Sequence, residues 1–351
     1  MSIYPKPVPV QSPVRVKVHN QRNLKPMRIL QISKELLTLS IRTKPWNRNQ
    51  FVSKTNAVLI RKSLEHLGSV FVKLGQMLAL RPDFISPIFC DELYKLLDQV
   101  PPFQSKLAMD ILKRELGSNF PKLLELESAP AASASFAQVH RAKLNNGDVV
   151  AVKIQRPDIE LVVRRDLEIM KFLARLFDFW FRPTNKLINI VEEFEIWTKD
   201  ELDYSLEAVN IEKFNEMASL VGDGIRGPRV YKELSTSRVL TMEFIDGYSL
   251  TQIITFLREG KKKQVKGFGF DGKDIVDKLI KNMLEMAHIH GYFHADPHPA
   301  NIIFTPGKEL VMIDFGIVGN LTKKERVLIL RYFRTLLAGN AKDSFDSLLE
   351  L

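Results

Sequence analysis

The octapeptide "HADPHPAN" occupies residues 294–301, and "VMIDFG" follows at residues 311–316. The first stretch allows two interpretations: a histidine cluster that binds zinc, or a loop whose oxygen-bearing side chains bind a hard cation. A zinc site would require four histidines to converge, namely His288, His290, His294 and His298. Pro297 and Pro299 prevent a helix on which two of these side chains could share a face, so zinc is disfavoured.

The spacing of the oxygen-bearing side chains favours the second interpretation. Asn301 lies five residues after Asp296, and Asp314 lies thirteen residues after Asn301, at the start of the triplet D-F-G. Phosphoryl transfer uses Mg²⁺ between phosphate oxygens, and this cation prefers carboxylate and amide oxygens as ligands. Asn301 and Asp314 are therefore predicted to bind Mg²⁺ or Mn²⁺. Asp296 is predicted to orient or deprotonate the attacking hydroxyl group or water.

A change of pattern upstream predicts a strand hairpin within residues 129–157. The triplet "NNG" at residues 145–147 separates two β-rich runs and favours a turn with positive φ. Lys153, in the second run, fits the position of a lysine that contacts ATP phosphates. A small-residue loop before the hairpin is predicted to cover these phosphates. Its candidate residues are Ala132, Ser133, Ala134 and Ser135. Alanine restricts the backbone more than glycine does, so this loop should be stiff.

The order of these motifs is more specific than any one of them. A lysine in a strand, then D-x-x-x-x-N, then D-F-G predicts a bilobal α+β fold of the protein-kinase type that binds ATP. Two features differ from an ordinary protein kinase. Ala295 stands where the catalytic loop usually has arginine, and no A-P-E triplet follows D-F-G. The usual partner of an activation-loop phosphate is therefore absent from the sequence.

In these residues and in the helical segment before them, the chain resembles the UbiB/ADCK family of atypical kinase-like proteins, over about residues 60–320. The stretch "KLGQ" is similar to the family's KxGQ signature, whose residues here are Lys73, Gly75 and Gln76. The stretch "ELDY" is similar to the family's ExD helix, whose residues here are Glu201 and Asp203. The resemblance implies a kinase-like fold with an N-terminal helical extension.

The resemblance also implies how the nucleotide is held. Glu207 would pair with Lys153 and position it over the α- and β-phosphates, whereas the alternative is an ordinary surface glutamate on a helix. Residues 239–247 would form a strand that enters a hinge. Backbone groups near Glu243 and Ile245 would hydrogen-bond adenine there.

A further implication concerns the side of the cleft where a protein kinase admits its peptide. Glu201 and Asp203 would meet Lys73 on that side, and the N-terminal extension would exclude protein substrates. The alternative is that Lys73 and Gln76, three residues apart on an apolar helix, form one exposed polar stripe.

Four parts are predicted along the chain. They are a basic, partly disordered N-terminal arm (1–56), a helical KxGQ extension (57–117), a kinase-like N-lobe with the alanine-rich loop and the ExD helix (118–246), and a partial C-lobe with the catalytic loop and D-F-G (247–351). Apolar spacing predicts a helix within 57–85 that ends at Arg81-Pro82. Family members usually continue well past D-F-G, so the C-lobe is expected to be shortened here.

The net charge of +10 is concentrated near the N-terminus. Residues 1–64 carry thirteen Lys and Arg against a single acid, Glu35. This segment predicts docking on an anionic membrane surface, a solvated tail, or an organellar transit peptide, whereas nucleic acid is not expected because no recognition motif accompanies the charge. The single cysteine, Cys90, suits a reducing compartment, and no long uncharged apolar segment predicts a membrane span. The predicted location is cytoplasmic with peripheral membrane association, or organellar if the N-terminus is a transit peptide.

The function implied by these features is that of a Mg²⁺-dependent ATPase supporting ubiquinone or other prenylquinone biosynthesis at a membrane surface. Its partners would be ATP, a lipid or quinone precursor, and other quinone-biosynthesis proteins. Two alternatives stay open. One is a small-molecule or lipid phosphotransferase, and the other is a nucleotide-gated binding module without turnover.

Overall fold

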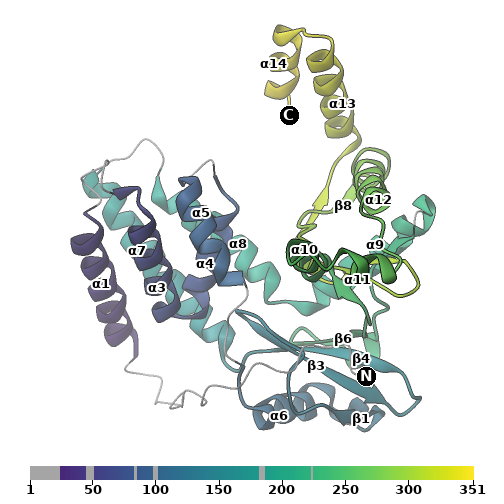
Figure 1. Cartoon of the computed structure of the whole chain (residues 1–351). Helices are drawn as coiled ribbons and strands as arrows, with labels where there is room; N and C mark the ends of the chain where they lie inside the picture. The colour runs from purple at the N-terminus through teal and green to yellow at the C-terminus, as the bar shows by residue number, and fades with distance from the viewer. Residues whose placement is uncertain (1–23, 45–50, 83–84, 98–101, 182–185, 223) are drawn as a thin grey trace. The chain divides into compact units, whose positions relative to one another are not determined.

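The computed structural model describes residues 24–44, 51–82, 85–97, 102–181, 186–222 and 224–351. The chain divides into two compact units. The first comprises Met1–Ala142 and Val152–Leu202, and the second comprises Lys143–Ala151 and Asp203–Leu351. The positions of the chain's parts relative to one another are not determined (Figure 1).

The first unit is mainly helical. Its helices are α1 (Leu24–Thr43), α3 (Lys54–Leu67), α4 (Ser69–Ala79), α5 (Pro87–Leu93), α6 (Ser105–Leu116), α7 (Ile159–Phe181) and α8 (Leu187–Glu201), with the 3-10 turns η2 (Tyr94–Leu97) and η3 (Gly117–Lys122). Its strands are β1 (Leu123–Leu126), β2 (Ala132–Ser133), and most of β3 (Ala137–Leu144) and β4 (Val149–Gln155).

The second unit mixes helices with short strands. Its helices and turns are α9 (Tyr204–Val221), η4 (Lys232–Leu234), α10 (Leu250–Arg258), α11 (Lys262–Gly267), α12 (Gly272–Glu285), the π-helical η5 (Met286–His290), η6 (Pro299–Asn301), α13 (Lys323–Leu337) and α14 (Ala341–Leu349). Its strands are β5 (Ile225–Arg226), β6 (Val239–Glu243), β7 (Tyr248–Ser249), β8 (Tyr292–His294), β9 (Ile302–Phe304), β10 (Leu310–Met312) and β11 (Val318–Asn320).

Gly68 separates two helices where apolar spacing predicted one within residues 57–85. Ser53 begins α3, because its side chain accepts a hydrogen bond from the Asn56 N–H. Gly68 has a φ of +96°, which a right-handed helix cannot contain and which glycine tolerates. The chain therefore turns between α3 and α4, although the apolar spacing continues through both.

The core of the first unit lies among α4, α7 and α8. Phe71 of α4, Leu167 of α7 and Phe194 of α8 are buried in one cluster. Phe136, which follows the alanine-rich loop, is buried in the same cluster, so the loop is joined directly to the helical core. Burial of each large apolar side chain stabilises the fold by about 1.5–3 kcal/mol.

Helix α1 lies beside α3, as Figure 1 shows. It was not anticipated, because residues 1–56 were expected to form a partly disordered arm. The helix is joined to the core by Ile32, which is fully buried. Part of the basic N-terminal segment is therefore a packed helix.

A β-hairpin carries the predicted lysine strand. Between β3 and β4, Gly147 has a φ of +91°, which confirms the turn predicted at residues 145–147. The strand order of this sheet is β1-β3-β4-β6, and β2 pairs with β3.

Two small sheets in the second unit position the 294–301 loop. One has the order β5-β10-β9-β7, with β10 antiparallel to β9 and parallel to β5. The other pairs β8 with β11. In the β9–β10 ladder Met312 lies opposite Ile302, so Asn301 and Asp314 leave the ladder at the same end.

Side-chain caps explain where two helices of the second unit begin. Ser249 begins α10 in a capping box with Gln252, and Thr322 begins α13 in a capping box with Glu325. The second box accounts for the helix that follows D-F-G so closely. None of the helices in the described part of the chain combines the length and the apolarity that crossing a bilayer requires.

Candidate functional site

His294 joins the 294–301 loop to the D-F-G triplet. Its Nε2 lies 2.5 Å from the carbonyl oxygen of Asp314, and its Nδ1 accepts a hydrogen bond of 3.1 Å from the Asp296 N–H. Nε2 therefore carries the proton and donates to Asp314. Burial lowers the pKa of His294, although the hydrogen bond to Asp314 opposes this effect. A neutral imidazole thus fixes the backbones of the two aspartates relative to each other.

The two histidines of the loop are engaged in hydrogen bonds to the backbone. Both ring nitrogens of His294 are occupied, and Nδ1 of His298 accepts a hydrogen bond of 3.2 Å from the Ala300 N–H at the start of η6. Within the described ranges, no group of three or more His, Cys, Asp or Glu side chains is arranged to hold a metal ion. The pair predicted to bind magnesium has a different composition, one carboxylate and one amide.

Asn301 and Asp314, the predicted metal ligands, lie on neighbouring chain segments. The Ile313 N–H donates a hydrogen bond of 2.9 Å to the Asn301 carbonyl oxygen, which continues the β9–β10 ladder by one residue. Both candidate ligands are half-buried, as is Asp296 earlier in the loop. Oδ1 of Asp314 accepts a hydrogen bond of 3.1 Å from the Gly316 N–H. The amide and carboxylate oxygens of the pair suit the ligand preference of Mg²⁺.

Helix α9 holds the D-F-G phenylalanine by its backbone. The Phe315 N–H donates to Oε1 of Glu207 at 3.4 Å, and Nδ2 of Asn210 donates to the Phe315 carbonyl oxygen at 3.1 Å. The Phe315 side chain is fully buried between the rings of Phe214 and His294, with centroid distances of 5.0 and 4.9 Å. The buried Glu207 is therefore tied to the segment that carries Asp314.

Asn210 was not assigned to the site from the sequence. The Tyr292 hydroxyl donates to the Asn210 carbonyl oxygen at 3.1 Å and lies 3.2 Å from its Oδ1. Asn210 therefore contacts both D-F-G and strand β8. Burial raises the pKa of Tyr292 to about 12, so its hydroxyl keeps the proton it donates. No local sequence pattern marks this contact, because the two residues are 82 positions apart.

Arg226 connects three segments of the second unit and was also not assigned. Its two terminal nitrogens donate to both carboxylate oxygens of Glu243, at 2.7 and 3.0 Å, and its Nε donates to Glu309 at 3.2 Å. Glu243 ends β6 before the predicted hinge, and Glu309 precedes β10, which leads to Asp314. Burial opposes the charge of Glu243, but hydrogen bonds from Arg226 and the Arg229 N–H hold its pKa below the usual value.

The predicted hinge passes close to strand β9. A Cβ atom at Gly247 would lie 2.4 Å from the Phe304 carbonyl oxygen, so a larger residue does not fit there. Ile245 is buried just before this contact. Adenine binding by backbone groups near Glu243 and Ile245 stays a prediction.

The alanine-rich loop of the first unit is closed by hydrogen bonds. The Ala134 N–H donates to the Ala137 carbonyl oxygen at 2.9 Å. Arg156 donates to the Ala134 carbonyl oxygen and to the Ser133 hydroxyl, both at 3.0 Å. Ala132 and Ala134 are exposed. Such bonding agrees with a stiff loop, whereas contact with phosphate stays a prediction.

Ser135 ties this loop to the KxGQ helix. Its buried hydroxyl donates to Oε1 of Gln76 at 3.1 Å, and Nε2 of Gln76 donates to the Leu96 carbonyl oxygen at 2.9 Å. Gly75 is buried beside Gln76 on α4. Gln76 therefore bridges two segments, and the alternative of a merely exposed polar stripe does not describe it.

Lys73 and Glu201 form an ion pair within the first unit. Nζ of Lys73 lies 2.6 Å from Oε2 of Glu201, and the two side chains are 25% and 26% exposed. Asp203 belongs to the second unit, where its carboxylate caps α9 by accepting a hydrogen bond of 3.0 Å from the Ser205 N–H. Exclusion of protein substrates by these residues stays a prediction.

Lys153 lies in the part of β4 that belongs to the first unit. Its strand neighbours Val152 and Ile154 are fully buried, whereas Lys153 is half-buried. Glu207 belongs to the second unit. The predicted pairing of Lys153 with Glu207 therefore stays a prediction.

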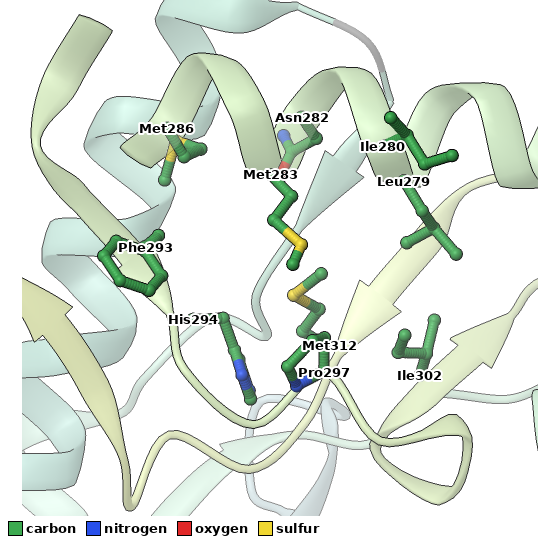
Figure 2. A pocket seen from close by; sticks show the side chains of 10 residues that line it. All are labelled: Leu279, Ile280, Asn282, Met283, Met286, Phe293, His294, Pro297, Ile302 and Met312. Carbon is green, nitrogen blue, oxygen red and sulfur yellow. The ribbon is translucent and has the colours of Figure 1, made fainter. Parts of the chain in front are cut away.

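A small apolar cavity of about 160 Å³ lies beside the 294–301 loop. Figure 2 shows Met283 of α12 and Met312 of β10 pointing toward each other, with His294 and Pro297 below them. The other lining residues are Leu279, Ile280, Asn282, Met286, Phe293 and Ile302. Ligand sites usually enclose about 300–1,000 Å³, so this cavity is too small and too apolar for a nucleotide.

A model of the ABC1 atypical kinase-like domain matches residues 95–347, which is more than half of the chain. The chain belongs to the ABC1 atypical kinase-like family. Family membership confirms the resemblance to UbiB/ADCK proteins that the KxGQ helix, the alanine-rich loop and the 294–301 loop indicated. It also agrees with the kinase-like α+β fold.

Several relatives share about one third of their residues with this chain. An uncharacterized protein of Synechocystis sp. is 35% identical over 281 residues, which cover 78% of this chain and 39% of the relative. Protein ACTIVITY OF BC1 COMPLEX KINASE 7, chloroplastic, of Arabidopsis thaliana is 33% identical over 300 residues, with coverages of 85% and 42%. Probable protein kinase UbiB of Shewanella denitrificans is 32% identical over 289 residues, with coverages of 80% and 51%. The chain spans about two fifths to one half of the length of these relatives.

A solved structure has a similar fold. It is the complex of Rv3197 with erythromycin from Mycobacterium tuberculosis, with a TM-score of 0.57 and 25% sequence identity. The match covers 90% of this chain and 75% of that chain. The predicted kinase-like fold class is thus confirmed.

Proposed function

We propose that this protein is a Mg²⁺-dependent ATPase that supports ubiquinone or other prenylquinone biosynthesis at a membrane surface. Membership of an atypical kinase-like family supports a nucleotide as the substrate. The observation that carries the proposal is the link through His294, which fixes the backbone of Asp296 relative to that of Asp314. With Asn301, these aspartates supply the side chains that phosphoryl transfer needs nearest the γ-phosphate.

Asn301 and Asp314 would hold Mg²⁺ or Mn²⁺, because they offer oxygen ligands at one end of the β9–β10 ladder. A bound cation would neutralise charge on the phosphate oxygens. Asp296 would orient a water molecule and accept its proton. His294 is neutral and buried, so it would hold the two aspartate backbones in place without exchanging a proton itself.

Lys153 would contact the α- and β-phosphates, with Glu207 as its partner. Ala132 and Ala134, which are exposed, would cover the phosphates from a loop that Arg156 and Gln76 hold in place. Ser135, which binds Gln76, would thereby join the phosphate cover to the KxGQ helix. This arrangement supports a tightly held nucleotide.

Hydrolysis is favoured over transfer to a protein. Ala295 removes the usual partner of an activation-loop phosphate, and the ion pair of Lys73 with Glu201 supports the family's exclusion of peptide substrates. Labelled ATP distinguishes the remaining options. Free phosphate as the product would support an ATPase, a phosphorylated lipid or quinone precursor would indicate a phosphotransferase, and binding without any product would indicate a nucleotide-gated module.

The quinone and membrane parts of the proposal are supported by the family rather than by the site. One relative is named as a UbiB protein, and others are named as chloroplastic, which supports an organellar location. The basic N-terminal segment supports peripheral contact with anionic lipids.

The assigned metal role can be tested by thermal unfolding with and without Mg-ATP. Asp314→Asn keeps the shape of the side chain but removes the charge that binds the cation, so we expect the stabilisation by Mg-ATP to disappear. Asp277→Asn is the matched control, because Asp277 is an exposed aspartate on α12. An unchanged ligand-induced shift in Asp314→Asn would contradict the assignment.

A further inference from the structure

Helix α1 is attached to the first unit by one face. Arg28 donates to both carboxylate oxygens of Asp166, at 3.0 and 2.6 Å, and to the Leu67 carbonyl oxygen at 2.5 Å. Ile32, one turn further on, is fully buried, and Thr43 at the end of the helix is buried too. The carbonyl oxygen of Thr43 accepts a hydrogen bond of 3.1 Å from Asn56. The inner face is thus packed and hydrogen-bonded.

The opposite face of α1 is also apolar, but it is exposed. We call its four residues the outer stripe: Met27 (69% exposed), Leu30 (69%), Leu37 (63%) and Ile41 (61%). Their spacing of three, seven and four residues places them along one side of a helix. An ordinary surface helix carries polar residues on the side away from the core. Single exposed leucines are common, whereas an aligned row of this kind is a candidate interaction surface.

The charges around the outer stripe are positive. Lys34, Arg42 and Lys44 are exposed. The one acid of α1, Glu35, is 22% exposed and is paired with α3. Hydrogen bonds from Ser63 and His66 hold its pKa below the usual value against the effect of burial, with the His66 contact at 3.1 Å, and Arg42 acts in the same direction. The sequence before α1 adds further Lys and Arg and no acid. Lys34 lies in the seven-residue gap of the row, four residues after Leu30 and three before Leu37, so this face carries a cation among its apolar side chains. A face that is both apolar and cationic matches a surface that is both apolar and anionic.

We propose that the outer stripe of α1 docks this protein on an anionic lipid membrane. The helix would lie in the plane of the membrane, with the four side chains at the boundary of headgroups and acyl chains. Lys34, Arg42 and Lys44 would lie near the lipid phosphates. The proposal names the element that would carry the membrane contact in the proposed function. It does not depend on ATP turnover, because α1 contains none of the assigned site residues.

Two other partners fit these features less well. A second copy meeting the same face would bring two sets of cations together across a symmetric contact. A nucleic acid would match the cations, because contacts with its phosphates supply most of the affinity of such complexes. It would leave the apolar row without a partner. A lipid surface satisfies both the apolar and the charged side chains.

Co-sedimentation with vesicles tests the proposal, in the absence of nucleotide. The full chain should bind vesicles of phosphatidylcholine mixed with phosphatidylglycerol better than vesicles of phosphatidylcholine alone, and added salt should weaken the binding. Leu30→Gln/Leu37→Gln should reduce binding to the mixed vesicles about tenfold or more. The matched control is Leu220→Gln/Leu349→Gln, which changes two leucines of similar exposure, 66% and 70%, on α9 and α14.

Several results would overturn this assignment. One is an outer-stripe variant that binds vesicles as well as the unmodified chain, and another is equal loss in the control variant. A change of molecular mass by light scattering in Leu30→Gln/Leu37→Gln would assign the stripe to a second copy. Binding of single-stranded DNA that competes with vesicles and is insensitive to these substitutions would assign the cations to nucleic acid. If the unmodified chain binds the mixed vesicles but does not hydrolyse ATP, the proposed function is refuted and the membrane assignment of α1 is not.

Discussion

Gly75 lies where helix α4 passes two leucine side chains. A Cβ atom at this position would be 2.4 Å from Cδ1 of Leu96 and 2.8 Å from Cδ1 of Leu64. Leu96 is buried in a core cluster, so its side chain has little room to move away. Removing glycine from a helix gains up to about 1 kcal/mol, but overpacking a core costs about 1–3 kcal/mol. We expect Gly75→Ala to lower the free energy of unfolding by about 1 kcal/mol in a urea titration.

Gly267 provides the control for this substitution. It lies in helix α11, and a Cβ atom there would meet nothing within 4 Å. Gly267→Ala should therefore leave the free energy of unfolding unchanged or raise it by up to about 1 kcal/mol. Equal effects of the two substitutions would show that helix propensity, and not the leucine contacts, decides the choice of glycine in the KxGQ signature.

His294 gives the stability a dependence on pH. Burial lowers its pKa in the folded protein below the ordinary value of 6.5. The unfolded chain therefore takes up a proton as the pH falls through about 6.5 while folded His294 stays neutral, and stability is lost from that pH downward. Buried His140 contributes in the same direction, because burial lowers its pKa too.

We expect the free energy of unfolding to be lower at about pH 5.5 than at about pH 7.5 for this reason. His294→Asn should reduce the difference between the two pH values, and a second substitution, His140→Asn, should reduce it further. Urea titrations at both values check this. A difference that both variants keep in full would assign the pH dependence to other groups.

Arg226 shows how one side chain organises several elements. It binds Glu243 at the end of β6 and Glu309 before β10, and its own side chain is 34% exposed. Partial exposure screens these charges, so we expect Arg226→Gln to lower the free energy of unfolding by about 1–2 kcal/mol. Arg226→Lys should lower the free energy of unfolding almost as much as Arg226→Gln, because lysine cannot donate two parallel hydrogen bonds to a carboxylate.

Arg229→Gln is the control for Arg226. Arg229 is 66% exposed and its side chain contacts Asp148 at 3.3 Å, so its loss should cost at most about 0.5 kcal/mol. A double-mutant cycle of Arg226→Gln with Glu243→Gln measures the coupling directly. No coupling, or an effect of Arg226→Gln as small as that of Arg229→Gln, would show that the bridge does not stabilise these elements.

The chain divides into two compact units, and the proposed function assigns nucleotide-contacting residues to each of them. Lys153 belongs to the first unit, whereas Asn301 and Asp314 belong to the second. A nucleotide that contacts all three would stabilise the units together. We expect calorimetry to show a broader or divided unfolding transition without ligand and a single, higher transition with Mg-ATP. Lys153→Met should prevent this change, and its persistence in that variant would exclude Lys153 from the site.

Much of the fold class followed from local patterns. The order of Lys153, D-x-x-x-x-N and D-F-G indicated a kinase-like fold, and the turn at residues 145–147 was placed correctly because asparagine and glycine tolerate positive φ. The ends of the helices were harder to predict from the sequence. One helix was expected within 57–85, but Gly68 interrupts it, and α1 was missed because apolar residues occur on two of its faces.

What could be read along the chain was therefore the chemistry of the motifs, since the types and spacing of Asp296, Asn301 and Asp314 are local properties. The partners of those motifs depend on folding. Three such contacts are the hydrogen bonds of His294 with Asp314, of Gln76 with Ser135, and of Arg226 with Glu243. Each joins residues that are many positions apart in the chain. These contacts form only when packing brings separate segments within hydrogen-bond distance. For that reason they cannot be predicted from the spacing of residues along the chain.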